Sequence, residues 1–340
     1  MNSCSVVILN WNGANYLRRF LPVLISHTTL PGVELVVADN ASTDGSLPVL
    51  ETEFPSIRCI VLDKNYGFAG GYNKAIEQID SEVIVLLNSD VEVSPGWLEP
   101  LLQQLNDHTD VVACQPKIRA FHQREQFEHA GAAGGFIDIL GYPFCRGRIL
   151  SCTETDVAQY DTVRDIFWAT GACMVVRTAV YRSCGGLDDD FFAHMEEIDL
   201  CWRMQSRGYR ITAVPASVVY HVGGGTLSSE SPRKTYLNFR NNLLMLYKNL
   251  PDSELNRILI LRWLLDLVAA LHLLLSGKPS NALSVLKAQR DFIRMKKDFS
   301  ERRHENQQQS VASDLKGCYK GSILFDYYFK RHKTFSSLPF

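Results

Sequence analysis

The sequence predicts an α/β fold with a mostly parallel central sheet and helices on both of its faces. Continuous apolar runs of strand length alternate with segments of helix length through the first part of the chain, and several runs end in polar residues. Strands buried on both faces read as unbroken apolar runs, and their alternation with helices is typical of a parallel sheet. Hydrophobic residues make up 46% of the 340 residues, so a sizeable core is available. The length fits one large domain with an appendage, or two modest domains.

The predicted elements follow in chain order. Strands are expected at residues 5–9, 33–38, 57–62, 83–87 and 111–115. Helices are expected from the turn at Gly13 to about residue 26, and then at 46–54, 71–79 and 95–105. Residues 117–165 are glycine-rich and weakly periodic, which predicts an irregular connection over a site. A strand at 171–177, a helix from Glu196 to Gly208 and short strands at 210–214 and 217–220 come next. Residues 232–303 read as helical, and 305–313 as a loose polar tail.

Charge and cysteine content exclude several classes of protein. The chain has 35 Lys and Arg against 37 Asp and Glu, a net charge of −2, which argues against a nucleic-acid-binding protein. Its nine cysteines contain no C-x-x-C pair, which argues against a disulfide framework and a structural zinc site. The N-terminus has no basic region before its first apolar run, so no signal peptide is predicted. A cytoplasmic location is therefore expected.

Polar clusters follow three of the predicted strands: 10–12, 39–42 and 88–90. The carboxyl ends of parallel strands share one edge of the sheet, where ligands bind, so these clusters should lie together. Asp39 could accept hydrogen bonds from a base or ribose, or it could shape a turn with Asp44. Asp90 could ligate Mg²⁺ or Mn²⁺ on a diphosphate, or lie in a solvated turn.

Three further features could carry chemistry. The glycines of 65–71 could bring backbone amides to an anion, or form a tight turn. Glu196 and Glu197 open a helix, where acidic residues cap and stabilise, but apolar neighbours such as Phe191 could raise their basicity to that of a general base. His221 precedes a run of glycines, which favours a ligand role over a packed core position.

Six strings occur in order and together decide the interpretation: SVVILNWNG, VVADNASTDGS, NYGFAGGYN, VIVLLNSDVEV, GGLDDDFFAHMEEIDLCWRMQSRGY and VYHVGGGT. The ordered set, over residues 3–250, resembles the family 2 glycosyltransferases with the GT-A fold, in particular the rhamnosyltransferase-like branch of surface polysaccharide synthesis. The resemblance implies an inverting, metal-dependent enzyme that moves a sugar from a nucleotide-diphospho-sugar to a glycan or a lipid-linked saccharide. It implies a catalytic domain at 1–250, with a nucleotide half (1–116) and an acceptor half (117–250), and a helical extension at 251–340.

The resemblance also implies roles for individual residues. The nucleotide-sugar would be bound by Asn10, Trp11, Asn12, Asp39, Asn65, Gly67, Gly70, Asn88 and Ser89. The divalent cation, Mn²⁺ or Mg²⁺, would be held by Asp90 and His221. The base would be Glu197, with Glu196 as its competitor.

Two departures from the family pattern keep alternatives open. The metal-binding D-x-D element reads Asn88-Ser89-Asp90, so one carboxylate is missing, and Glu197 stands where an aspartate is usual. A catalytically degenerate member that binds a glycan or a partner is one alternative. A sugar nucleotidyltransferase is another, although the chain lacks an early G-x-G-x-R-L-type loop.

Residues 258–275 are the most apolar segment, with Arg262, Asp266, His272 and Ser276 in one stripe of a predicted helix. No uninterrupted apolar stretch reaches the ~20 residues of a spanning helix. The helix could pack on the catalytic domain or in a homodimer, or it could lie in a membrane surface. Residues 287–303 hold seven Lys and Arg against three Asp and Glu, which suits an anionic leaflet. Peripheral contact of 258–303 with the inner face of the cytoplasmic membrane is therefore expected.

Overall fold

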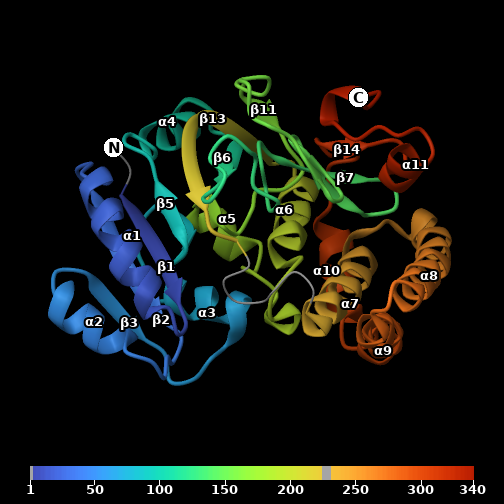
Figure 1. The fold of residues 1–340 in the computed structure, drawn as a ribbon, viewed down its shortest axis with the longest axis horizontal. Coiled ribbons are helices and arrows are strands. Elements are labelled where there is room, and N and C mark those ends of the chain that lie inside the picture. The colour runs from blue at the N-terminus through green and yellow to red at the C-terminus, as the bar shows by residue number, and fades with distance from the viewer. Residues whose placement is uncertain (1–2, 224–230) are drawn as a thin grey trace.

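A nine-stranded sheet forms the centre of the computed structural model, which describes residues 3–223 and 231–340. Its strand order is β11-β13-β6-β12-β4-β1-β2-β3, and β5 pairs with β13 (Figure 1). The strands are β1 (Cys4–Asn10), β2 (Val33–Asp39), β3 (Arg58–Val61), β4 (Val83–Asn88), β5 (Val91–Val93), β6 (Val111–Ala120), β11 (Arg164–Asp165), β12 (Cys173–Arg177) and β13 (Arg210–His221).

The strands β3, β2, β1 and β4 run parallel, and their register brings the predicted polar clusters together. Asn10 lies opposite Asp39 across β1 and β2, and Leu9 lies opposite Asn88 across β1 and β4. The expectation that these strand ends share one edge of the sheet is thus confirmed. Beyond β4 the sheet is mixed, because β12 runs antiparallel to both β4 and β6.

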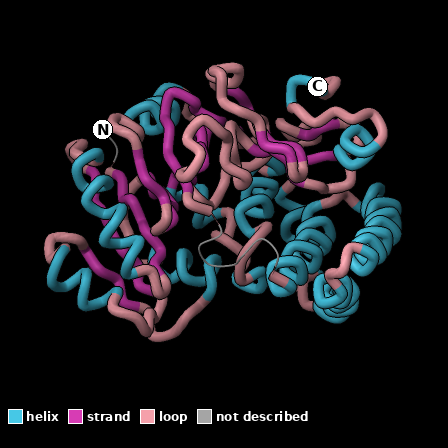
Figure 2. Tube along the Cα trace, in the orientation of Figure 1, coloured by secondary structure: helices cyan, strands magenta, loops and turns pink. Residues whose placement is uncertain are grey.

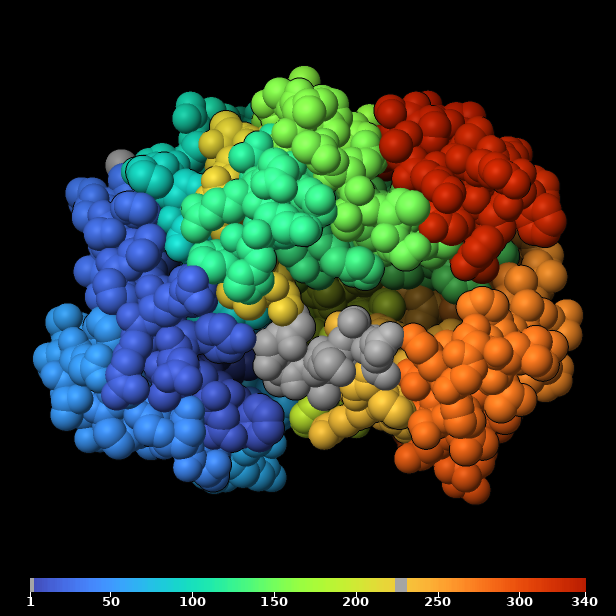
Figure 3. All heavy atoms as spheres, viewed as in Figure 1, coloured from blue at the N-terminus to red at the C-terminus, as the bar shows by residue number. Residues whose placement is uncertain are grey.

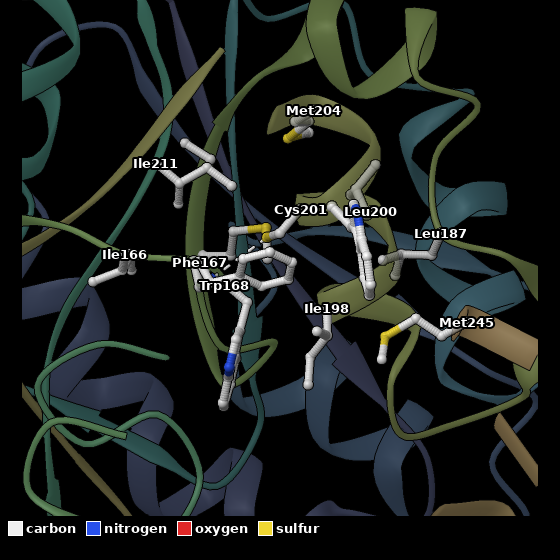
Figure 4. Packing of buried hydrophobic residues seen from close by; sticks show 14 of the residues in the cluster. Ile166, Phe167, Trp168, Leu187, Ile198, Leu200, Cys201, Met204, Ile211 and Met245 are labelled. Atoms are coloured by element: carbon white, nitrogen blue, oxygen red, sulfur yellow. Dashed lines mark hydrogen bonds between the residues drawn. The ribbon is translucent and has the colours of Figure 1, made fainter. Parts of the chain in front are cut away.

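Helices cover both faces of this sheet. The N-terminal helices are α1 (Ala14–His27), α2 (Ser46–Glu53), α3 (Gly67–Ile76) and α4 (Glu99–Asp107), followed by α5 (Thr178–Ser183) and α6 (Glu196–Ser206). Successive residues of a strand point to opposite faces, so β4 contributes Val85 to the apolar cluster under α1 and α4, and Leu86 to the cluster under α3 and α6. Figure 4 shows the second cluster, where Ile198 and Cys201 of α6 lie near Phe167 and Trp168.

The segment 117–165 contains four short strands of a second, five-stranded sheet, which the prediction of an irregular connection did not include. Turns and loops make up much of the remainder. The strands of the second sheet are β7 (Gly135–Asp138), β8 (Pro143–Cys145), β9 (Arg148–Ile149), β10 (Cys152–Thr153) and β14 (Cys318–Tyr319). These strands are too short to give an alternating apolar pattern. Glycines also interrupt the pattern, because neighbouring side chains fill the space that a Cβ would need. A Cβ at Gly135 would overlap the Trp168 ring.

Two other predictions of secondary structure were wrong. The predicted strands at 210–214 and 217–220 are one strand, β13, with a register shift between Val214 and Val218. Pro215 lies at this irregularity, where a missing N–H is tolerated. The expected loose tail is largely helical, because α10 (Ser300–Gln309) occupies most of it.

The C-terminal part is helical but returns to the second sheet. It comprises α7 (Pro232–Asn249), α8 (Asp252–Leu275), α9 (Pro279–Met295), α10 and α11 (Ile323–Tyr328), and Figure 2 shows α7, α8 and α9 grouped at one end of the molecule. Strand β14 lies between α10 and α11 in sequence and pairs with β7. The chain after α10 therefore completes a sheet that begins near residue 135.

A buried ionic network joins α7 to α6. Lys248 Nζ of α7 lies 2.5 Å from Asp188 Oδ2 and 2.8 Å from Asp199 Oδ2. Arg203 also pairs with Asp199, at 2.8 Å. Burial opposes ionisation of Asp199, but the two cations outweigh it and lower the pKa of this carboxyl. The network therefore stays charged and fixes the two helices to each other.

Lys248→Ala is expected to lower the free energy of unfolding by about 3 kcal/mol, because two buried carboxylates lose a shared cation. Urea denaturation monitored by circular dichroism measures the change. Lys74→Ala is the matched control, since Lys74 pairs with Glu77 on the surface. The assignment is wrong if the two variants unfold at the same urea concentration.

Candidate functional site

The loops after β1 and β2 are locked to each other. Asn10 Nδ2 donates to Asp39 Oδ2 at 2.9 Å, and Asp39 Oδ1 accepts from the Ser42 amide at 2.8 Å. Asn12 has a left-handed backbone, with φ 53°, and its Oδ1 accepts from the Thr43 amide at 2.8 Å. The two loops therefore form one rigid edge, with Asn10, Asn12 and Asp39 brought together as predicted.

Some hydrogen-bond acceptors at this edge have unused capacity. Among the described residues, no hydrogen-bond partner reaches the buried Oδ1 of Asn10. Asp39 is fully buried, but its carboxylate has about four acceptor positions, of which the protein uses two. Trp11 is exposed, so its indole face is accessible. These features suit recognition of a planar polar group.

The Asn65–Gly71 loop serves packing. Asn65 Oδ1 accepts from the Gly67 amide at 2.8 Å, which shapes the turn into α3. Gly67 has φ +74°, and a Cβ there would lie 2.6 Å from the Phe192 ring. A Cβ at Gly70 would lie 3.0 Å from Tyr66 Cβ. Close packing of α3 thus accounts for both glycines, and contact of Gly67 and Gly70 with a ligand stays a prediction.

His221 lies between two carboxylates. Because Val91 pairs with His221 across β5 and β13, Asp90 is brought beside the imidazole. Asp90 Oδ1 lies 3.1 Å from His221 Nε2, and Glu128 Oε2 lies 3.5 Å from His221 Nδ1. The Asn88 amide nitrogen is 3.5 Å from Nε2, and Ser89 stands in the same turn. Burial disfavours charge on the ring, but the two acids outweigh it and raise the pKa of His221 to about 10.

Two atoms of this cluster are of the kinds that ligate a divalent cation. Neighbouring ligand atoms around an octahedral Mg²⁺ at ~2.1 Å lie roughly 3 Å apart, as Asp90 Oδ1 and His221 Nε2 do. A ligating histidine usually donates its second ring N–H to a carboxylate; Glu128 Oε2 faces Nδ1 at 3.5 Å, but among the described residues Nδ1 makes no hydrogen bond. Among the described residues, no group of three His, Cys, Asp or Glu side chains could hold a metal ion. A cation here would need oxygen atoms from a bound ligand to complete its coordination.

Glu128 was not predicted from the sequence to be a residue of this site. It lies between β6 and β7, in the segment without periodicity, and its amide donates to Ile118 O at 3.0 Å. That bond places it beside β6, next to β13 and His221. An isolated acid in a glycine-rich segment carries no local signal for such a role.

The acidic pair follows a loop with unusual backbone conformations. Phe192, His194 and Met195 have φ values of 65°, 72° and 75°, in the left-handed region that non-glycine residues avoid. Asn241 of α7 holds the loop: its side-chain amide donates to the carbonyl oxygens of residues 191, 193 and 194 at 2.8–2.9 Å. The Phe192 carbonyl in turn accepts from the amides of Phe68 and Ala69 in α3. The loop thus connects the acidic pair to the start of α3.

Glu197 is connected to the end of β4 through Gly171 and Ala172. A Cβ at Gly171 would lie 4.0 Å from Glu197 Cβ, and the neighbouring Ala172 carbonyl accepts from the Asn88 amide at 3.0 Å. Among the described residues, one carboxylate oxygen of Glu196 and one of Glu197 are buried without a hydrogen-bond partner. Such oxygens are free to accept a proton or a hydroxyl group.

Burial separates the titration of the two acids. It raises the pKa of Glu197 to about 7, against the opposing effect of backbone amides at the start of α6. Burial and the charge of Glu197 raise the pKa of Glu196 well above its usual value. At Glu197 burial thus outweighs the helix dipole, and the pKa lies near neutrality.

Residues 5–182 match the sequence model described as Glycosyl transferase family 2. The chain belongs to this family. It is 26% identical over 231 residues to the N-acetylglucosaminyl-diphospho-decaprenol L-rhamnosyltransferase of Mycobacterium tuberculosis, across 64% of this chain and 75% of that protein.

Solved structures show the same fold. GalNAc-T7 with UDP, GalNAc and Mn²⁺ matches with a TM-score of 0.58 at 16% identity, over 73% of this chain and 48% of that one. S. aureus TarS 1–349 with UDP-GlcNAc matches with a TM-score of 0.55 at 16% identity, over 90% and 89% of the two chains. The predicted GT-A fold of a family 2 glycosyltransferase is thereby confirmed.

Asn241→Ala is expected to lower the free energy of unfolding by about 1–3 kcal/mol, because it removes the donor to three loop carbonyls. It should also speed hydrogen exchange at the amides of Phe68 and Ala69, since the Phe192 carbonyl that they bond loses its support. Exchange is followed by NMR. Asn256→Ala, on an exposed part of α8, is the control. Unchanged exchange at both amides would show that the loop is held by other contacts.

Proposed function

We propose that this family 2 glycosyltransferase is inverting and metal-dependent. It would transfer a sugar from a nucleotide-diphospho-sugar to a glycan or lipid-linked saccharide acceptor in polysaccharide and cell-envelope synthesis. The observation that carries the proposal is that the Asp90–His221 pair and Glu197 both lie near the residues at the end of β4. The mycobacterial relative, named for a diphospho-decaprenol substrate, supports the acceptor class.

We infer that the donor binds at the edge of the sheet formed by the ends of β1, β2 and β4. Its base and ribose would meet Asp39, Asn10, Trp11 and Asn12, and its diphosphate would lie toward Asn65, Gly67, Gly70, Asn88 and Ser89. On this proposal residues 1–116 form the nucleotide half, 117–250 the acceptor half and 251–340 an extension. The acceptor would enter the hollow visible in Figure 3 between the green mid-chain residues and the orange helices. UDP and UDP-GlcNAc in the similar structures support a nucleotide-sugar donor.

Asp90 and His221 would hold Mn²⁺ or Mg²⁺, with Glu128 orienting the imidazole through Nδ1. The cation would neutralise the diphosphate and make it a better leaving group. The Mn²⁺ in the GalNAc-T7 structure supports this choice of metal. The absent D-x-D carboxylate at Asn88 would be replaced by His221, which approaches from β13.

Glu197 would act as the general base. Its carboxylate takes the proton of the acceptor hydroxyl, the hydroxyl oxygen bonds to the anomeric carbon, and the bond to the diphosphate breaks on the opposite face. The configuration at that carbon is thereby inverted without a covalent intermediate. Glu196 suits this role less well, because burial and the charge of Glu197 raise its pKa well above the usual value and disfavour its ionised form.

One observation favours a second candidate, a degenerate member that binds a nucleotide-sugar or glycan without turnover. Asn88 stands where a metal-binding acid is usual, and its amide nitrogen faces His221 at 3.5 Å. The two candidates differ in one measurement: a degenerate member would be stabilised thermally by a nucleotide-sugar but would release no nucleotide.

We also propose that the protein is located in the cytoplasm.

Chelation is expected to abolish nucleotide release from a panel of UDP- and GDP-sugars, and Mn²⁺ or Mg²⁺ should restore it. His221→Ala should need at least about tenfold more metal for half-maximal rate, because a ligand is lost. His27→Ala, whose imidazole contacts the Val93 carbonyl away from this cluster, is the control. Full activity in chelator would refute the metal requirement.

Glu197→Gln is expected to cut transfer ~10²–10⁴-fold while leaving thermal stabilisation by the donor unchanged, because shape is kept and basicity is lost. In the wild type the rate should rise with pH through about 7 and level off above it, since only the deprotonated acid can take a proton. Steady-state rates between pH 5.5 and 9, read as order-of-magnitude changes, measure both effects. If Glu196→Gln is inactive while Glu197→Gln keeps the wild-type rate, the base is Glu196; if both variants are active, the pair is structural.

A further inference from the structure

Helix α8 buries charged side chains and exposes many apolar ones. Two charged residues in the middle of the helix face the protein: Arg262 is 2% exposed and Asp266 is 0% exposed. Many of its apolar residues face outward, and Val268 and Leu275 are 63% and 79% exposed. A surface helix of a water-soluble domain normally has the opposite arrangement, with its apolar stripe on the core. The outer environment of α8 is therefore expected to be apolar.

Buried contacts fix this orientation. The Arg262 guanidinium lies 3.8 Å from the centre of the Tyr142 ring and donates to the Leu140 carbonyl at 2.9 Å. It also lies 3.6 Å from Asp266 Oδ1, one turn along α8. Gln289 of α9 donates to the Trp263 carbonyl at 3.1 Å. Turning the apolar face inward would break all of these interactions, so the outward face is a built feature of the fold.

The outward face extends onto α9. Leu261, Trp263, Leu264 and Leu271 of α8 are exposed together with Leu283, Leu286 and Ile293 of α9. An open groove of about 380 Å³ separates the two helices, and all of its lining residues are apolar, including Leu271, Leu274, Ala282 and Leu286. Contiguous apolar surface of this kind marks a docking site. Figures 1 and 3 place α8 and α9 at the edge of the molecule, away from β1 and β2.

Charge on the same helices identifies the partner. Lys287, Arg290 and Arg294 of α9 are exposed among its outward apolar residues, and Lys297 follows directly after them. Basic residues beside an apolar face match anionic lipid headgroups, each contributing ~1 kcal/mol near such a surface. Trp263 is of the type that settles at headgroup level. A second copy of this chain would instead bring these cations against one another.

We propose that α8 and α9 form a membrane-docking face that lies in the plane of an anionic phospholipid surface. The 24 residues of α8, a length of ~36 Å, could also cross a bilayer by length and composition. The contacts of Arg262 with Leu140 and Tyr142, however, hold the middle of α8 against the folded domain, which a spanning helix would have to leave. The proposal stands on these two helices and does not depend on the transfer chemistry.

The face has a direct connection to the candidate site. Helix α7 packs against both α8 and α9, and the same helix carries Asn241, which holds the loop before Glu196. Docking would therefore leave only α7 between the lipid-facing helices and the loop of the candidate site. The saccharide of a lipid-linked acceptor would then lie close to that site.

Flotation of the full chain with vesicles tests the proposal. Binding is expected with vesicles of phosphatidylcholine and phosphatidylglycerol, and weaker binding with phosphatidylcholine alone. Val268→Asp should reduce binding at least about tenfold, because it puts a charge where docking would bury an apolar side chain in the lipid. Val157→Asp is the matched control, since Val157 is 73% exposed on a different part of the chain and should bind as the wild type does. Arg290→Glu with Arg294→Glu should remove the preference for anionic vesicles.

Several outcomes would overturn the proposal. They are an absence of wild-type binding to either vesicle, or equal loss of binding in Val157→Asp and Val268→Asp. A third is a wild-type dimer in sedimentation velocity that Val268→Asp dissociates, without vesicle binding, which would make the face a contact between copies. Leu275→Asp, at the exposed end of α8, replaces Val268→Asp if that variant fails to fold. Donor-induced thermal stabilisation is measured on every variant, so a loss of docking is distinguished from a loss of the proposed transferase site.

Discussion

The ion pairs of Lys248 with Asp188 and Asp199 are the interaction on which the rest of the structure depends. They fix α7 to α6 inside the protein, where separating the charges is costly. Helix α6 carries the acidic pair, and α7 carries Asn241 and supports α8 and α9. One buried cation thus fixes the helix that follows the 192–195 loop against the helix that supports the C-terminal helices.

Sequence reasoning succeeded where local pattern and sheet geometry agree. Unbroken apolar runs predicted parallel strands, and parallel register then required Asn10 and Asp39 to meet. The proximity of Asp90 and His221 was expected from the resemblance alone, because nothing local connects residues so far apart. Glu128 was out of reach, since its role arises from a backbone bond to Ile118 and the pairing of β6 with β13.

Two other features could not be predicted for different physical reasons. The second sheet is completed by β14, which pairs with β7, and a partner so distant leaves no trace in the pattern of residues 117–165. The stripe containing Arg262 and Asp266 was visible, but periodicity shows only that two faces of a helix differ. Which face is buried is decided by Tyr142 and Leu140, which belong to another part of the chain.

The pairing of β7 with β14 has a consequence for synthesis. Ile137 leaves the ribosome long before its partner Cys318, and at ~5–20 residues per second the delay is roughly 10–40 s. During that time β7 has an unpaired edge, which invites non-native strand pairing. The parallel strands β1 to β4, by contrast, are all synthesised before residue 137, so they can pair without waiting for β14.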